Sequence, residues 1–172
     1  MTLISSADFK AGMRPFGAAV NIITTAAGGQ FHGVTATAVC SVSAEPPSLL
    51  VCINRSASIH DPVRAARHFC VNLLAAEQVE LARRFSSSDE AARRRRFEGL
   101  AVESLKTGSP VLPDAVAAYD CELVETVESA THTIFIGLVA AMRRAPGNVD
   151  ALMYRDGQFG VWSPLASALA AE

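Results

Sequence analysis

The sequence predicts a mainly β domain with short inserted helices that closes as a small barrel. Six or seven apolar, β-branched segments follow one another along 172 residues, in mostly antiparallel order. Turn residues such as Gly28-Gly29 and Pro46-Pro47 separate the first of these segments. The helical patterns between them are short, and such a set of strands closes most naturally as a barrel. A chain of this length is expected to form one domain, residues 1–172, with a core from about 6 to 160.

The N-terminal third predicts one helix and three strands. Ser5 or Ser6 is a suitable cap for the helix, and Arg14-Pro15 ends it. Prolines cannot donate to a strand ladder, so Glu45-Pro46-Pro47 is expected at a corner. The expected elements are helix Ser6–Met13 and strands Gly17–Thr25, Val34–Ser43 and Ser48–Asn54.

The rest of the chain predicts short helices first and then paired strands. Asp61-Pro62 has the composition of a helix start, with Asp as cap, and Ser87-Ser88-Asp89-Glu90 resembles a capping box. Gly108–Pro113 is expected to be loop. The expected helices are Asp61–Ala66, Glu77–Phe85, a second one through Arg96, and a terminal one over 163–172. The expected strands are His68–Leu74, Ala118–Val127, His132–Arg143, Ala151–Tyr154 and Gln158–Trp162.

Composition excludes several classes of function. With 15 basic and 17 acidic residues the net charge is −2, so nucleic acid is not expected as the main partner. No apolar run approaches the roughly 18 residues that span a membrane, and Met1–Lys10 does not resemble a secretory signal. Four separated cysteines form no Cys-x-x-Cys pair and predict buried free thiols and a cytoplasmic protein. No histidine and cysteine cluster has zinc spacing, so no metal is expected.

The run from Phe16 to Ser58 indicates a ligand site. Thr35, Ala36, Thr37 and Ala38 are small residues in a strand, where a flat ligand has room to approach the backbone. The loop that follows the next strand, Asn54-Arg55-Ser56-Ala57-Ser58, combines hydroxyls, an amide and a cation, which suits phosphate. Together they point to a bound flavin, although tight sheet packing and a solvated turn also produce such patterns.

Five stretches resemble the short-chain flavin reductase family, the small reductase partners of two-component flavin monooxygenases. They are GAAVNIITT, HGVTATAVCSVSAEPPSLLVCINRSAS, HFCVNLL with EQVELARRF, GSPVLPDAVAAYDCELVE and THTIFIGLV. The resemblance covers roughly residues 6 to 160 and is nearest to the FMN reductase of pyrimidine utilisation and the reductase of 4-hydroxyphenylacetate monooxygenase. It implies a split β-barrel flavin-binding fold, a homodimer, FMN or FAD, NADH or NADPH as hydride donor, and a monooxygenase partner.

The resemblance also assigns site residues. The strand from Thr35 to Ala38 is expected to hold the flavin ring, and Asn54, Ser56 and Ser58 its phosphate and ribityl chain. The run Arg93–Arg96 is mostly a solvated face, from which one arginine is expected near the phosphate. The cofactor-binding residues implied are Thr35, Ala36, Thr37, Ala38, Cys52, Ile53, Asn54, Arg55, Ser56, Ser58, Phe85, Ser86, Arg93 and Tyr154.

His132 is the residue expected to act on the hydride donor. The family pattern there is often Gly-Asp-His, and this chain has Ala130-Thr131-His132, which keeps the imidazole but changes the turn. In the family this histidine orients the nicotinamide, whereas a lone histidine at a strand start is otherwise more often structural. The chain has no Gly-x-Gly-x-x-Gly, so the dinucleotide is expected to bind directly over the flavin. The alternatives are a reductase of another acceptor, such as a cobalt corrinoid, and a non-catalytic flavin- or haem-binding split barrel.

Overall fold

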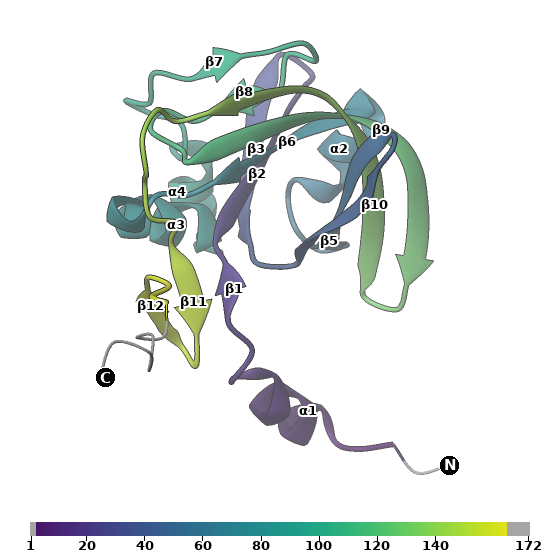
Figure 1. Cartoon of the computed structure of the whole chain (residues 1–172). Helices are drawn as coiled ribbons and strands as arrows, with labels where there is room; N and C mark the ends of the chain where they lie inside the picture. The colour runs from purple at the N-terminus through teal and green to yellow at the C-terminus, as the bar shows by residue number, and fades with distance from the viewer. Residues whose placement is uncertain (1–2, 165–172) are drawn as a thin grey trace, which may run out of the picture.

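A computed structural model describes residues 3–164 and shows a curled antiparallel sheet with short helices around it (Figure 1). The helices are α1 (Ser6–Met13), α2 (His60–Ala66), the 3-10 turn η1 (Ala76–Gln78), α3 (Val79–Ser86) and α4 (Glu90–Arg94). The first strands are β1 (Ala18–Ala19), β2 (Asn21–Ala27), β3 (Gln30–Ala36), β4 (Val39–Ala44), β5 (Pro47–Asn54) and β6 (His68–Leu73). The later strands are β7 (Glu103–Ser104), β8 (Pro110–Val111), β9 (Ala117–Ser129), β10 (His132–Arg144), β11 (Met153–Arg155) and β12 (Gln158–Gly160).

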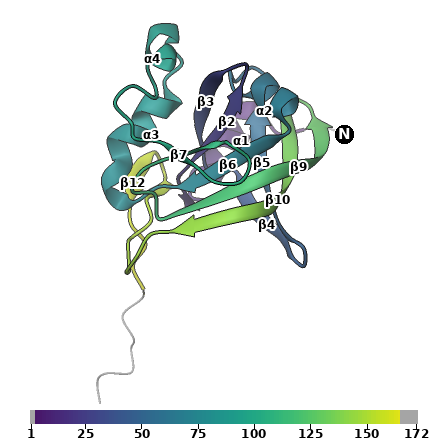
Figure 2. The same ribbon diagram turned by 90° about the horizontal axis from the view of Figure 1, so that it is seen from above.

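The main sheet has seven strands in the order β3-β2-β6-β9-β10-β5-β4, and every pair is antiparallel. Its two edge strands, β3 and β4, are consecutive in the chain and are joined only by Thr37-Ala38. The sheet must therefore curl until its edges meet at this link (Figure 2). Within residues 3–164, β3 and β4 do not pair with each other, so the barrel has an open seam. The predicted mainly β, split-barrel fold is confirmed.

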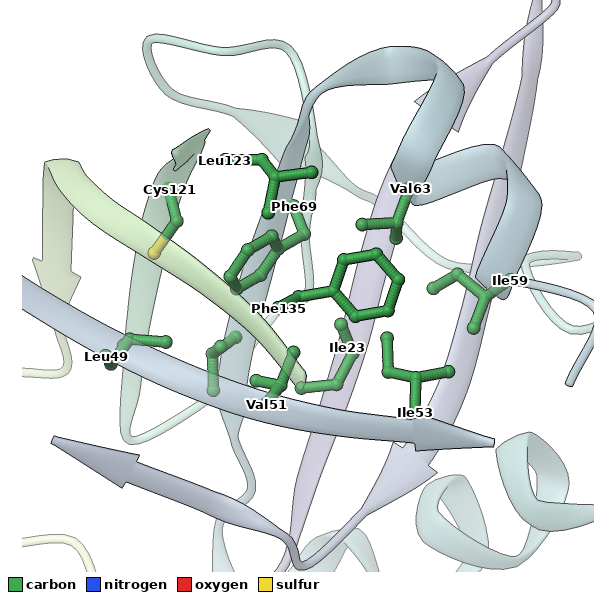
Figure 3. Close-up of a cluster of buried hydrophobic side chains, with 11 residues drawn as sticks. Ile23, Leu49, Val51, Ile53, Ile59, Val63, Phe69, Cys121, Leu123 and Phe135 are labelled. Carbon is green, nitrogen blue, oxygen red and sulfur yellow. The ribbon is translucent and has the colours of Figure 1, made fainter. Parts of the chain in front are cut away.

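The barrel is filled by large side chains from facing strands. Phe69 on β6 and Phe135 on β10 are fully buried and lie at its centre with Ile23, Val51 and other aliphatic residues (Figure 3). Burying side chains of this size is the main force that holds the strands together. Gly137 on β10 is needed because a Cβ there would lie 2.8 Å from the Phe69 ring.

A second apolar cluster fixes α3 to the outside of the barrel. Ala82 and Phe85 of α3 are fully buried against Ile22, Leu112 and Leu152. Helix α3 therefore lies against β3 and the neighbouring β2. The predicted helix Glu77–Phe85 is present, but its first residues form the 3-10 turn η1.

Two predicted strands are each divided in the structure. Gly17–Thr25 is interrupted at Val20, because β1 pairs with β11 in a separate three-stranded sheet while β2 joins the barrel. Val34–Ser43 begins earlier, at Gln30, and breaks at Thr37-Ala38, where the chain passes from one sheet edge to the other. Both breaks result from the positions of distant strands, which local sequence does not record.

The predicted helix caps are correct at one helix and wrong at two. Ser5 caps α1, and its side chain accepts a hydrogen bond from the amide of Asp8. Helix α2 begins at His60 with Ile59 as cap, and Asp61 pairs with the His60 ring instead of capping. Helix α4 is capped by Asp89, not by the Ser87 box, and ends at Arg94.

The C-terminal part differs from prediction in smaller ways. The expected loop Gly108–Pro113 contains β8, which pairs with β7. The last two strands are shorter than predicted and form the β11–β12 hairpin. Most of the expected terminal helix over 163–172 lies outside the described residues. Among the residues described, no helix has the length and apolar character needed to span a membrane.

Candidate functional site

A hollow of about 700 Å³ lies beside the edge strand β3. Helix α3 and the β11–β12 hairpin form its other walls. Strand β3 pairs with β2 on one side only, and an edge strand leaves alternate backbone N–H and C=O groups without a strand partner. The residues that line this ring hollow are Val20, Thr35, Ala36, Thr37, Val79, Ala82, Arg83, Ser86, Tyr154, Gly157, Gln158 and Phe159.

The small residues of β3 have two different environments. The Thr35 hydroxyl donates a 2.6 Å hydrogen bond to the Ala82 carbonyl and so fastens β3 to α3. Ala36 packs partly into the barrel core. Thr37 and Ala38 form the link to β4, where the Ala38 carbonyl accepts from the amide of Cys52 at 3.0 Å. The hydroxyl proton of Thr35 is therefore engaged within the protein, which leaves backbone groups and Thr37 to face a ligand.

An aromatic pair forms the wall opposite β3. The rings of Tyr154 and Phe159 lie 5.2 Å apart at 60°, and the Arg83 guanidinium lies 5.7 Å from the Phe159 ring centroid. Arg83 is also paired with Glu80 at 2.6 Å. Tyr154 was a predicted site residue, whereas Arg83 and Phe159 were not predicted from the sequence. A signal for Arg83 existed, because Val79, Ala82, Arg83 and Ser86 recur at helical spacing.

A second hollow of about 660 Å³ lies at the other end of β3 and carries positive charge. Arg93, Arg94 and Arg96 line it, while its one carboxylate, Glu90, is paired with Arg94. Three guanidinium groups against one carboxylate favour an anion. The residues that line this basic hollow are Gln30, Phe31, His32, Gly33, Ser58, Glu90, Arg93, Arg94, Arg96 and Phe97. Two predicted residues, Ser58 and Arg93, are among them.

The loop after β5 and the start of β10 lie together. His132 is directly opposite Asn54 in the β5–β10 ladder, and the Arg55 amide donates to the Thr131 carbonyl at 2.9 Å. The Asn54 side chain accepts from both the amide and the hydroxyl of Ser56. The imidazole of His132 is exposed and lies 2.8 Å from the Thr131 hydroxyl.

Most residues of the loop after β5 and of the start of β10 do not line either hollow. Of the loop only Ser58 lines the basic hollow, and His132 lines neither hollow. The Arg55 side chain is 3.6 Å from Glu128, which also binds Arg64 at 2.6 Å, so part of its charge is compensated.

Two predicted site residues, Phe85 and Ile53, have side chains in the interior, and a third, Cys52, is partly buried. Phe85 is fully buried and stacks edge-on to Phe97, with the ring centroids 5.1 Å apart. Ile53 is 2% exposed and points into the barrel core. Cys52 is partly buried, and burial raises the pKa of its thiol. Contact with a ligand from Phe85 and Ile53 is therefore limited to backbone atoms.

A third hollow of about 570 Å³ opens at the mouth of the barrel and is mostly apolar. Val39, Leu49, Tyr119 and Val139 are among its lining residues. Thr37 lines both this mouth hollow and the ring hollow, so the two adjoin at the seam between β3 and β4.

Comparison with known proteins identifies relatives along most of the chain. Residues 13–163 match the family described as "Flavin reductase like domain". A curated protein from Rhizobium rhizogenes, named FMN reductase (NADH) RutF 2, is 42% identical over 152 residues, which cover 88% of this chain and 86% of that protein.

Two solved structures share the fold over nearly the whole chain. The NADH:FAD oxidoreductase SgcE6 of Streptomyces globisporus, in complex with NAD and FAD fragments, superposes with a TM-score of 0.84 at 28% identity and covers 97% of this chain and 100% of its own. BorF, the flavin reductase component of a bacterial two-component tryptophan halogenase, has a TM-score of 0.81 at 28% identity and covers 94% of this chain and 100% of its own.

Proposed function

The chain belongs to the flavin reductase family, and from this premise we propose that it is an NADH-dependent flavin reductase that transfers hydride from reduced nicotinamide to FMN or FAD. The observation that carries the proposal is the ring hollow. It joins the free backbone edge of β3 to an aromatic wall, and the basic hollow lies at the other end of the same strand. Its volume of about 700 Å³ is in the range of cofactor sites.

The residues present fit a flavin nucleotide. The unpaired backbone edge of β3 would offer hydrogen bonds to the polar edge of a flavin ring, and Tyr154 and Phe159 would offer a surface for stacking. Arg93 and Ser58 offer charge-assisted and neutral hydrogen bonds to a phosphate. When bound, the flavin supplies the electron-accepting ring, while the contribution of the chain is to bring the two reactants together in the correct orientation.

His132 is proposed to orient the nicotinamide. It is exposed, and its position opposite Asn54 places it beside the proposed ribityl and phosphate loop. We expect His132→Ala to raise the KM for NADH about tenfold while the KM for flavin changes less than about twofold. Steady-state kinetics with each substrate varied in turn measure both constants. An equal rise in both, or in neither, contradicts the role.

We propose that the working form is a homodimer in which a second copy covers the mouth hollow, α1 and β4. Helix α1 has no buried residue, and Phe9, Met13 and the following Phe16 are 44–67% exposed. Strand β4 is exposed along most of its length. Large apolar side chains gathered on one side of a protein mark an interaction surface.

We further propose a cytoplasmic protein of one domain that delivers reduced flavin to a separate flavin-dependent oxygenase. BorF supports the last point, because it is the reductase component of a two-component system. All four cysteines are free thiols, as is usual in the cytoplasm. The oxygenase would accept free reduced flavin, so no stable complex is required.

The test of the proposed reaction is the loss of NADH absorbance with purified protein and with FMN, FAD or no added flavin. We expect fast, saturable loss that depends on free flavin, and the ratio of the two rates ranks FMN against FAD. Replacing NADH by NADPH ranks the donors. A folded protein that oxidises neither donor with either flavin would contradict the reductase and favour a flavin-binding protein or a reductase of another acceptor.

A further inference from the structure

Arg96 is a buried cation without a carboxylate partner in the part of the chain that the structure describes. The residue is 4% exposed, and its two terminal nitrogens donate to backbone carbonyls, Nη1 to Gly33 at 2.6 Å and Nη2 to Ser87. Its Nε makes no hydrogen bond among these residues. Burial, with a smaller contribution from the positive charge of Arg93, lowers the pKa of the guanidinium.

Burying a cation is unfavourable unless nearby groups replace its water. Here two carbonyl oxygens replace the water, that of Gly33 on β3 and that of Ser87 at the end of α3. Ser87 is the C-cap of that helix, and the negative end of a helix dipole favours a cation. The guanidinium also lies 6.0 Å from the Phe85 ring centroid. The carbonyl groups that Arg96 binds therefore explain why a cation is tolerated at this position.

These two carbonyls belong to the elements that enclose the proposed flavin site. Gly33 lies on β3, in the wall of the basic hollow, and Ser87 directly follows Ser86, which lines the ring hollow. Further along β3, Thr35 binds α3 through Ala82. Thr35 therefore binds β3 to α3, and Arg96 links β3 to the C-cap residue of the same helix.

We propose that Arg96 is a positioning residue for flavin reduction. Its planar guanidinium holds the edge of β3 at a fixed distance from the end of α3, and so sets the width of the site for the whole flavin, ring and phosphate alike. A lysine has one nitrogen in place of two and cannot span both carbonyls in the same geometry. This inference rests on the proposed function and adds to it the residue that sets the shape of the site.

The test compares Arg96→Ala and Arg96→Lys with the wild type, using FMN and riboflavin, which has no phosphate, as alternative acceptors. We expect Arg96→Ala to raise the KM for both flavins in parallel, by about tenfold or more, while the KM for NADH stays within about twofold. The KM of Arg96→Lys for each flavin should lie between those of the wild type and Arg96→Ala. Millimolar guanidinium chloride should restore part of the lost flavin affinity of Arg96→Ala, because the ion fits the space left by the side chain.

Arg95→Ala is the matched control, because Arg95 is the exposed neighbour of Arg96 and lines neither the ring hollow nor the basic hollow. A rise in KM for FMN but not for riboflavin would overturn the proposal and show a direct phosphate contact. Folded variants with unchanged KM for both flavins would overturn it as well. If the alanine variant does not fold, the lysine variant decides on the same criteria.

The failure of the inference can be told from the failure of the proposed function. Flavin binding is also followed without turnover, by quenching of flavin fluorescence. If the wild type binds flavin but does not oxidise NADH, the proposed reaction fails, whereas a parallel loss of FMN and riboflavin binding in Arg96→Ala still supports the role of Arg96. Unchanged dissociation constants in both variants would contradict it.

Discussion

Gly33 shows how closely α3 approaches the strand that carries the proposed site. A Cβ on this residue would lie 2.5 Å from Cε1 and 2.8 Å from Cδ1 of Phe85, and 3.2 Å from Cζ of Phe97. Phe85 is fully buried, so its ring has no free space to move into. The absence of a side chain at position 33 is what allows Phe85 to seal the space between the helix and β3.

We expect Gly33→Ala to lower the free energy of unfolding by about 1–3 kcal/mol, because overpacking a filled core forces side chains off their preferred rotamers. Urea unfolding measures the change. Gly160→Ala is the control, since a Cβ there meets nothing within 4 Å and the backbone does not have a positive φ. Equal stability of the two variants would show that the ring can move after all.

The buried thiol of Cys121 makes the folded protein less stable as the pH becomes alkaline. Burial, with a smaller effect of the Asp120 carboxylate, raises the pKa of its thiol from 9.0 to about 12. The folded protein therefore keeps this proton at a pH where the unfolded chain has lost it. A raised pKa of this kind stabilises the fold below pH 9, and the stabilisation is lost as the pH rises toward 12.

The expected loss from this one thiol is about 1.4 kcal/mol per pH unit above pH 9. Urea unfolding of the wild type and of Cys121→Ala, near pH 8 and near pH 10.5, measures the part of this loss that comes from Cys121. The alanine variant is less stable at the lower pH but should lose less stability on going to the higher one. Parallel losses in the two proteins would mean that the thiol ionises in the folded state.

At the scale of elements, the β11–β12 hairpin is the wall of the ring hollow that belongs to a separate three-stranded sheet. It pairs with the rest of the protein through two residues of β1, and Arg14 binds Asp156 at its turn at 2.8 Å. Its contribution to the site is the Tyr154–Phe159 pair, with Arg83 of α3 over the second ring. The hairpin therefore presents an aromatic surface that is positioned by β1, by Arg14 and by the packing of Phe159 against the second core cluster.

We expect Phe159→Ala to raise the KM for flavin about three- to tenfold, because it removes a stacking surface worth about 1 kcal/mol. The same change removes the aromatic ring next to Arg83, which keeps its ion pair with Glu80. Trp162→Ala is the comparison, since Trp162 lines neither the ring hollow nor the basic hollow and is 70% exposed. A flavin KM that is unchanged in Phe159→Ala would place the ring elsewhere.

A helix or strand can be predicted from the sequence when the residues that determine its ends are close to it along the chain. Helix α1 has the predicted bounds, because Ser5 and Arg14-Pro15 act within one turn of it. The breaks at Val20 and at Thr37-Ala38 depend on which distant strands lie alongside, and no local pattern contains that information.

The residues of the candidate site also differ in how well the sequence predicts them. The small residues of β3 and the loop with Ser58 were found from composition and resemblance, because their residue types suit a ligand. Phe85 looks like a ligand contact in the sequence but is a core residue, since its environment is set by Gly33 far along the chain. Arg96 is hidden among four consecutive arginines, and its burial alone distinguishes it.

At the scale of the whole molecule, the N-terminal helix points to a partner. An eight-residue helix is marginally stable by itself in water, yet α1 has no buried residue and stands away from the barrel in Figure 1. Both features are explained if a second copy packs against it, as in the proposed homodimer.

We expect deletion of residues 1–13 to shift the protein from dimer toward monomer, because it removes Phe9 and Met13 from the exposed apolar surface. Light scattering during size-exclusion chromatography measures the mass of each form. Lys10→Ala, a change on the same helix that adds no charge and leaves both apolar side chains in place, should remain dimeric. An intact dimer after the deletion would move the interface to β4 and the mouth hollow.

At the unpaired seam between β3 and β4, the same backbone groups could either stabilise the barrel or remain available to a ligand. A hydrogen-bonded ladder across the seam would close the barrel and make it more resistant to unfolding, but it would occupy the backbone groups that face the ring hollow. Substitutions that are selected only for thermal stability should therefore favour pairing of β3 with β4 and reduce the turnover number of the proposed flavin reduction. If the proposed site is correct, we expect activity to require that β3 and β4 remain unpaired at this seam.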